Sequence, residues 1–242
     1  MGKDVALLPG DMQRDRRSSL ASFIVALLIL ATACGTKHGS QSVQPRGAGS
    51  TSSTPAPAAA PKPAACKRWG CQPHQTVQLT DSRAVTLWLG RVAQDYESRP
   101  VLELQDHGVA VQWWISPQGD GWAGSLTCET SGPEPNCVLL DSLGMHASVA
   151  ETVMIRAGRL IHPDAAEVTT NTAGAQAVDL NADGYLDVIG RINDYRPNFA
   201  QGHTYWQTFR YSDGRLIATG CAPQIGDGPA PTQLLSGSCP MP

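Results

Sequence analysis

Residues 101–115 read VLELQDHGVAVQWWI, and this stretch decides the fold class. Two runs of branched and aromatic residues flank the polar segment that contains Asp106, His107 and Gly108. An Asp near a Gly readily adopts the left-handed backbone conformations that tight turns need. The stretch therefore predicts a β-hairpin.

The same pattern occurs near the end of the chain. Residues 203–211 and 215–218 are rich in branched and aromatic side chains, and they flank Asp213 and Gly214. Similar short runs recur about every ten residues, separated by Gly, Asp, Asn and Pro. Residues 66–242 are therefore predicted to form a mainly β domain, such as a small antiparallel β-sandwich.

One segment, residues 84–92 (AVTLWLGRV), fits two structures. Its apolar residues alternate as in a strand, but four of them also fall on one helical face after Asp81, a possible helix cap. Gly90 and the β-branched residues favour the strand.

Seven cysteines would leave an odd thiol in an exported protein. Setting Cys34 aside leaves six, which suits three disulfides and allows fifteen ways of pairing. Short loops close most easily, so we favour bridges between sequence neighbours. The expected pairs are Cys66 with Cys71, Cys128 with Cys137, and Cys221 with Cys239.

Residues 20–33 (LASFIVALLILATA) form an uncharged stretch after a basic segment, which is typical of an export signal. As a helix the stretch reaches roughly 21 Å, short of the roughly 30 Å of a bilayer core. Residues 1–33 are therefore predicted to be a removable signal peptide. A start at Met12 would give a more compact basic leader than a start at Met1.

The residues just before Cys34, namely Ala31, Thr32 and Ala33, resemble a bacterial lipobox. Ala31 stands where leucine is usual. The resemblance implies that lipid on Cys34 anchors the chain to the cell membrane, at its extracytoplasmic face. Residues 34–65 then form a linker rich in Pro, Ala and Ser, with almost nothing to bury, so it is expected to stay unfolded as a stalk.

The β domain is acidic. Residues 66–242 contain 18 acidic and 11 basic residues, a net charge of −7, compared with −3 for the whole chain. Nucleic acid is therefore not an expected partner.

The most chemically specific motif is DLNADGYLD, residues 179–187. Calcium needs six to eight oxygen ligands, and the spacing supplies oxygens at the first, third, fifth, seventh and ninth positions around a turn that Gly184 permits. The twelfth position, a glutamate in EF-hands, is Gly190 here, so we expect a strand-loop-strand calcium site. Its ligands would be Asp179, Asn181, Asp183, the carbonyl of Tyr185, and Asp187.

This loop resembles the calcium loops of FG-GAP and VCBS repeats, which occur in propellers and bacterial surface proteins. The match covers residues 177–192, and more loosely the hairpin that follows. A closed propeller needs at least four blades, whereas this domain has 177 residues and a single such loop. The resemblance therefore implies incomplete propeller-like blades. It also implies, by analogy, that the domain binds a partner.

The favoured function is a non-catalytic, calcium-stabilised surface module that binds a protein or glycan. The alternative is a cell-envelope hydrolase that uses two facing carboxylates. Candidates for that pair are Glu129, Glu134, Asp141 and Asp164. A sugar platform is another possibility at Trp113, Trp114 and Trp122, although adjacent Trp113 and Trp114 must face opposite sides of a strand.

Overall fold

The computed structural model describes residues 58–90, 99–117, 124–144 and 146–240. The predicted signal peptide, Cys34, Trp122 and most of the predicted linker lie outside these residues. Within the described ranges, no helix is long and apolar enough to cross a membrane.

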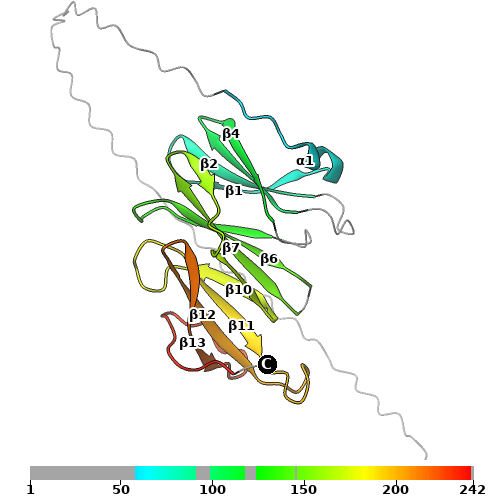
Figure 1. The fold of residues 1–242 in the computed structure, drawn as a ribbon, viewed down its shortest axis with the longest axis vertical. Helices are drawn as coiled ribbons and strands as arrows, with labels where there is room; N and C mark the ends of the chain where they lie inside the picture. The colour runs from blue at the N-terminus through cyan, green and yellow to red at the C-terminus, as the bar shows by residue number, and fades with distance from the viewer. Residues whose placement is uncertain (1–57, 91–98, 118–123, 145, 241–242) are drawn as a thin grey trace, which may run out of the picture. The chain divides into compact units, whose positions relative to one another are not determined.

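The described residues form three antiparallel sheets, which confirms the mainly β prediction (Figure 1). The first sheet contains β1 (Gln72–Gln78), β2 (Arg83–Leu89), β3 (Val101–Asp106) and β4 (Val109–Ile115). The middle sheet contains β5 (Ser125–Glu129), β6 (Asn136–Ser142), β7 (Ser148–Arg156), β8 (Arg159–Ile161) and β9 (Glu167–Thr170). The third sheet contains β10 (Thr172–Val178), β11 (Asp187–Asn193), β12 (Thr204–Ser212) and β13 (Arg215–Pro223).

Each sheet is a meander in which successive strands pair, and β9 adds to the middle sheet by pairing with β7. Both predicted hairpins form. His107 and Gly108 have φ angles of 51° and 75°, and Asp213 and Gly214 have φ angles of 50° and 78°. Positive φ at both central residues matches the right-handed twist of the flanking strands. The ambiguous residues 84–89 belong to strand β2.

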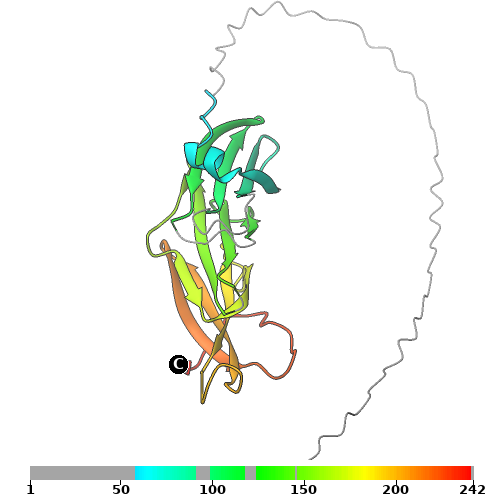
Figure 2. The same ribbon diagram turned by 90° about the vertical axis from the view of Figure 1, so that its right-hand side faces the viewer.

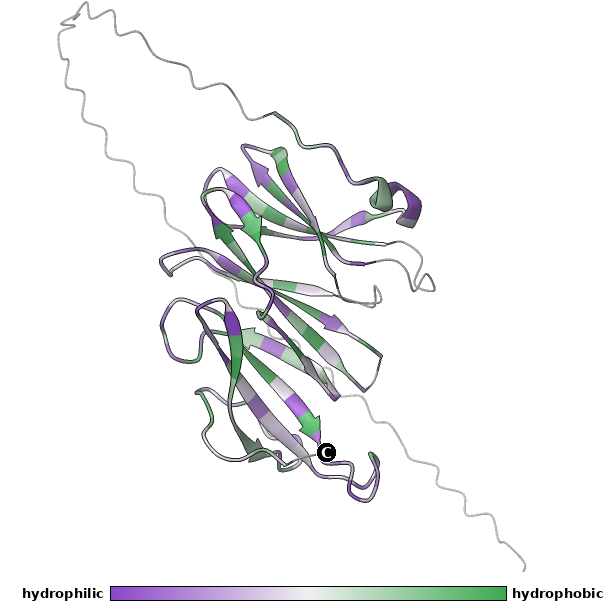
Figure 3. Ribbon diagram, viewed as in Figure 1, coloured by the Kyte–Doolittle hydropathy of each residue, from purple (hydrophilic) through white to green (hydrophobic). Residues whose placement is uncertain are grey.

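The middle sheet is covered on both faces. Side chains alternate along β6 and β7, so Leu139 and Val153 pack against Leu87 of the first sheet. Met154, on the opposite face, packs in a second apolar cluster that includes Val188 of the third sheet. Burial on both faces explains why β7 is buried from Ser148 to Ile155 and why apolar residues recur along the strands (Figure 3).

Two glutamine side chains also join the first and middle sheets. Gln75 accepts the Leu126 N–H at 3.0 Å and donates to the Leu126 carbonyl at 2.6 Å. Gln112 accepts the Leu160 N–H at 2.8 Å and donates to the Leu160 carbonyl at 3.1 Å. A carboxamide carries a donor and an acceptor, as a peptide group does, and so continues strand pairing where the two sheets meet.

A short helix, α1 (Ala64–Trp69), lies beside the first sheet (Figure 2). Trp69 packs there with Val101, next to Trp113. The Trp113 indole donates to the Ala60 carbonyl at 3.1 Å, so folded contacts begin before the predicted boundary at Cys66.

All three expected disulfides form, which confirms the neighbour pairing. They join Cys66 to Cys71, Cys128 to Cys137, and Cys221 to Cys239.

Candidate cation loop and adjoining pocket

The loop of residues 179–187 connects β10 to β11, as a strand-loop-strand motif should. It turns through left-handed conformations at Ala182 (φ 57°) and Gly184 (φ 83°). A Cβ added to Gly184 would collide with the Cα of Gly132. Glycine is thus required here both by the backbone angle and by the close approach of a second loop.

Asp179 organises the turn. Its Oδ1 accepts the N–H groups of Asn181 and Asp183, both at 3.3 Å, and its Oδ2 accepts the Gly184 N–H at 2.9 Å. Asp183 in turn accepts the Tyr185 N–H at 2.9 Å. These bonds hold the polar side chains on the inside of one tight bend, while Asn181 and Asp183 stay exposed.

Asp187 is different because its side chain is fully buried. One carboxylate oxygen accepts the Tyr211 N–H and the other accepts the Leu180 N–H, both at 3.0 Å. Burial raises the pKa of Asp187, and the charges of Asp183 and Asp179 raise it further, against the two backbone hydrogen bonds, which lower it. The residue therefore ties the loop to β12, and its ionised form lacks a compensating positive charge among the groups that act on its pKa.

A third side-chain amide fixes the loop to the middle sheet. Asn136 at the start of β6 is fully buried, donates to the Gly184 carbonyl at 3.1 Å and accepts the Leu186 N–H at 2.9 Å. The loop is thereby paired to the middle sheet on both sides of Tyr185.

The donor set of the loop matches the chemistry of calcium, although its oxygens are already hydrogen-bonded. In the described part of the chain, no three His, Cys, Asp or Glu side chains gather closely enough to form a metal cluster. An ionised carboxylate offers about four lone-pair sites, so accepting two or three N–H groups leaves capacity for a cation. The side chains of Asn181 and Asp183 are exposed, and the Asn181 amide donates to Asp183 Oδ2 at 2.8 Å, a bond that a cation at this position would replace.

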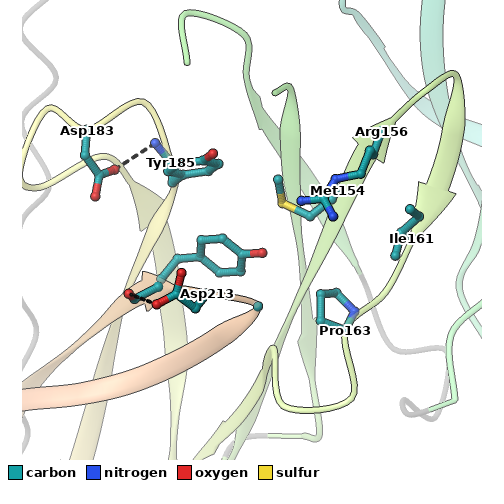
Figure 4. A pocket seen from close by; sticks show the side chains of 10 residues that line it. Met154, Arg156, Ile161, Pro163, Asp183, Tyr185 and Asp213 are labelled. Atoms are coloured by element: carbon teal, nitrogen blue, oxygen red, sulfur yellow. Dashed lines mark hydrogen bonds between the residues drawn. The ribbon is translucent and has the colours of Figure 1, made fainter. Parts of the chain in front are cut away.

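A pocket of about 460 Å³ adjoins the loop and shares Asp183 and Tyr185 with it (Figure 4). The rest of its lining comes from the middle sheet and from the β12–β13 hairpin. These residues are Met154, Arg156, Ile161, Pro163, Tyr211, Ser212, Asp213 and Gly214.

The pocket combines aromatic rings with fixed charges. The rings of Tyr185 and Tyr211 lie 5.4 Å apart between centroids. The Arg156 Nε donates to both carboxylate oxygens of Glu134, at 2.8 and 2.9 Å. This bond raises the pKa of Arg156 and lowers that of Glu134, so both stay charged at neutral pH.

Three of the four carboxylates suggested for a hydrolase serve separate contacts, and the fourth, Asp164, is exposed. Glu129 accepts the N–H groups of Thr130 and Ser131, Glu134 binds Arg156, and Asp141 accepts the Ser142 N–H.

The two described tryptophans of the suggested sugar platform face opposite sides of β4, as the alternation requires. Trp113 lies 5.6 Å from Trp88, on the side of α1, whereas Trp114 lies 5.3 Å from His162. Both are partly covered, so they do not form a shared open platform.

The loop could be located from the sequence, whereas the roles of Asn136, Arg156 and Tyr211 could not. These residues reach the site from other strands, and no local spacing connects them to the motif. The chain matches no protein-family model, no curated protein and no solved structure.

The substitution Asn136→Ala is expected to lower the free energy of unfolding by about 2–4 kcal/mol, because it leaves a buried carbonyl and a buried N–H without partners. Denaturant unfolding monitored by circular dichroism measures the loss. Gln233→Ala, which removes a carboxamide at an exposed position, is the control and should change the free energy by less than about 0.5 kcal/mol. Equal effects of the two substitutions would contradict the role given to Asn136.

Proposed function

We propose that the chain is a lipid-anchored bacterial envelope protein whose calcium-stabilised β domain binds a glycan in the pocket beside residues 179–187. The observation that carries the proposal is that the candidate cation loop and the pocket share Asp183 and Tyr185. A bound cation would therefore fix one wall of the binding pocket. A protein partner is the other outcome that the binding experiment below distinguishes.

Calcium is the proposed ion because the loop offers only oxygen ligands with the required spacing. Asp187 is a buried carboxylate next to two further carboxylates, an arrangement that costs free energy unless a positive charge offsets it. Ca²⁺ would supply that charge through Asp179, Asn181, Asp183, Asp187 and the Tyr185 carbonyl. This role is structural, since Asp187 and Asn136 tie the loop to the third and middle sheets.

The glycan follows from the pocket lining. Sugar rings present apolar C–H faces and many hydroxyl groups, which suit aromatic rings flanked by charged hydrogen-bonding groups. Tyr185 and Tyr211 provide the rings, while Asp183, Asp213 and Arg156 provide acceptors and donors. Because Glu134 already orients the Arg156 guanidinium, little conformational entropy is lost when Arg156 binds a ligand.

Calcium should raise the melting temperature of the purified chain relative to the chain in chelator. At about ten times the dissociation constant, the ion stabilises by about 1.4 kcal/mol, which corresponds to about 3–6 °C for a domain of this size. Differential scanning calorimetry measures the shift. Asp179→Asn should reduce the shift, and the control Asp227→Asn, outside the loop, should retain it. A wild-type melting temperature that is the same with calcium and with chelator would contradict calcium binding.

Arg156→Ala should weaken glycan binding about tenfold, or about 1.4 kcal/mol, because the pocket loses its oriented donor. Isothermal titration of neutral and acidic soluble oligosaccharides measures the affinity. Arg159→Ala is the matched control, because Arg159 pairs with Arg156 across the β7–β8 hairpin but does not line the pocket. If no oligosaccharide binds and the chain instead captures an envelope protein, the glycan proposal is wrong and the partner is a protein.

Lipid attachment predicts a mature chain that begins at Cys34 and carries acyl groups there. Mass spectrometry of the membrane-extracted protein should find this modification, and Cys34→Ser should release the chain from the membrane. Cys239→Ser, which removes a disulfide cysteine, should leave the acyl groups in place. A mature chain with a different first residue, or with an unmodified Cys34, would contradict the anchor.

A further inference from the structure

A buried polar cluster lies where the first and middle sheets meet, away from the proposed calcium loop. Its centre is Glu151 on β7, a residue that is 1% exposed. Alternation along the strand places Glu151 on the same face as Val153 and Ile155, which pack against the first sheet. Ser116, which directly follows β4 of the first sheet, donates its hydroxyl to Glu151 Oε2 at 2.5 Å.

The second carboxyl oxygen of Glu151 faces His162, which follows β8. Glu151 Oε1 and His162 Nε2 are 4.0 Å apart, and neither atom has a hydrogen-bond partner within the described residues. The imidazole packs beside Trp114 of the first sheet. Two buried polar atoms thus face each other across a gap slightly too wide for a hydrogen bond.

Within the described residues, the charged groups that shift the pKa values of this pair are carboxylates. Asp141 on β6 and Glu167 on β9 act on Glu151, and Asp164 acts on His162. Glu103 on β3 points the other way, because it binds the Trp88 indole. Burial raises the pKa of Glu151 to about 7 against the hydrogen bond from Ser116, and Glu167 and Asp141 raise it further. Burial lowers the pKa of His162.

We propose that Glu151 and His162 hold one proton between them, and that this proton stabilises the contact between the first sheet and the middle sheet. With one proton the buried pair is neutral overall, and a movement of about 1 Å completes its hydrogen bond. Loss of the proton leaves a buried carboxylate that faces Asp141 and Glu167 beside a neutral imidazole. Trp114 on β4 and Ser116 just after it contact the pair, so loss of the proton destabilises the contact between the first and middle sheets.

The sign of the pH dependence follows from the two groups. A carboxyl whose folded-state pKa is raised contributes stability that is complete below its usual pKa near 4.5 and is lost as pH rises through about 7. A histidine whose pKa is lowered contributes stability that is lost as pH falls through that lowered value. The contact between the two sheets is therefore more stable in mildly acidic solution and less stable as the medium becomes alkaline.

The first test compares melting temperatures of the full chain at about pH 5.5 and about pH 8.5. The Glu151 contribution should lower the wild-type value by about 4–8 °C between these two conditions. Glu151→Gln, which is neutral at every pH, should lack this loss and should melt above wild type at the higher pH. Glu134→Gln is the control, because Glu134 is ionised in both conditions, and it should follow the wild-type pH profile.

A second test needs no variant. Carbon-13 NMR titration of the wild-type chain should show the Glu151 carboxyl changing near pH 7, together with a response of the His162 ring carbons at the same pH. A Glu151 carboxyl that titrates near 4.5 would overturn the proposal. So would a Glu151→Gln chain whose melting temperature follows the wild-type dependence on pH.

Discussion

The burial of both faces of β6 and β7 is the constraint on which the rest of the structure depends. These two strands alternate apolar side chains toward the first sheet and toward the third, so neither of their faces is left for water. Neither outer sheet shares a strand with the middle one. A backbone bridge between Ala165 and Arg215 links the middle sheet to the third, and side chains pack both outer sheets against the middle one. Apolar packing supplies most of that attraction, but it does not by itself fix how the sheets are aligned.

Alignment is fixed by carboxamides that act as additional peptide groups. Gln75 and Gln112 pair with backbone of the middle sheet, and Asn136 pairs with the loop between β10 and β11 of the third sheet. Each makes a donor and an acceptor bond to nearly adjacent backbone groups, so a shift by one residue would break both. The proposed functional groups lie at these same contacts between sheets. The proposed calcium loop is the one that Asn136 binds, and the Glu151 cluster lies between the first and middle sheets, which Gln112 joins.

The local parts of this structure could be predicted from the sequence. Turn residues between apolar runs located both hairpins, loop closure selected the three disulfides, and oxygen spacing located the loop of residues 179–187. The carboxamide contacts between sheets could not be predicted. Gln75 and Leu126, for example, are 51 residues apart, and no local sequence pattern indicates that they pair. Arg156 and Tyr211 were missed for the same reason, since the pocket exists only once two sheets meet. Glu151 did leave a signal, as a lone charge within the apolar run VAETVMI.

Hydrogen exchange of three backbone N–H groups shows whether side-chain amides hold the three sheets as one unit. The Leu126, Leu160 and Leu186 N–H groups are donated to Gln75, Gln112 and Asn136. These three N–H groups should exchange as slowly as those in the interior of β6 and β7, because their opening requires the sheets to separate. Exchange at the rate of exposed loops, with β6 and β7 still protected, would show that the sheets are not joined in this way.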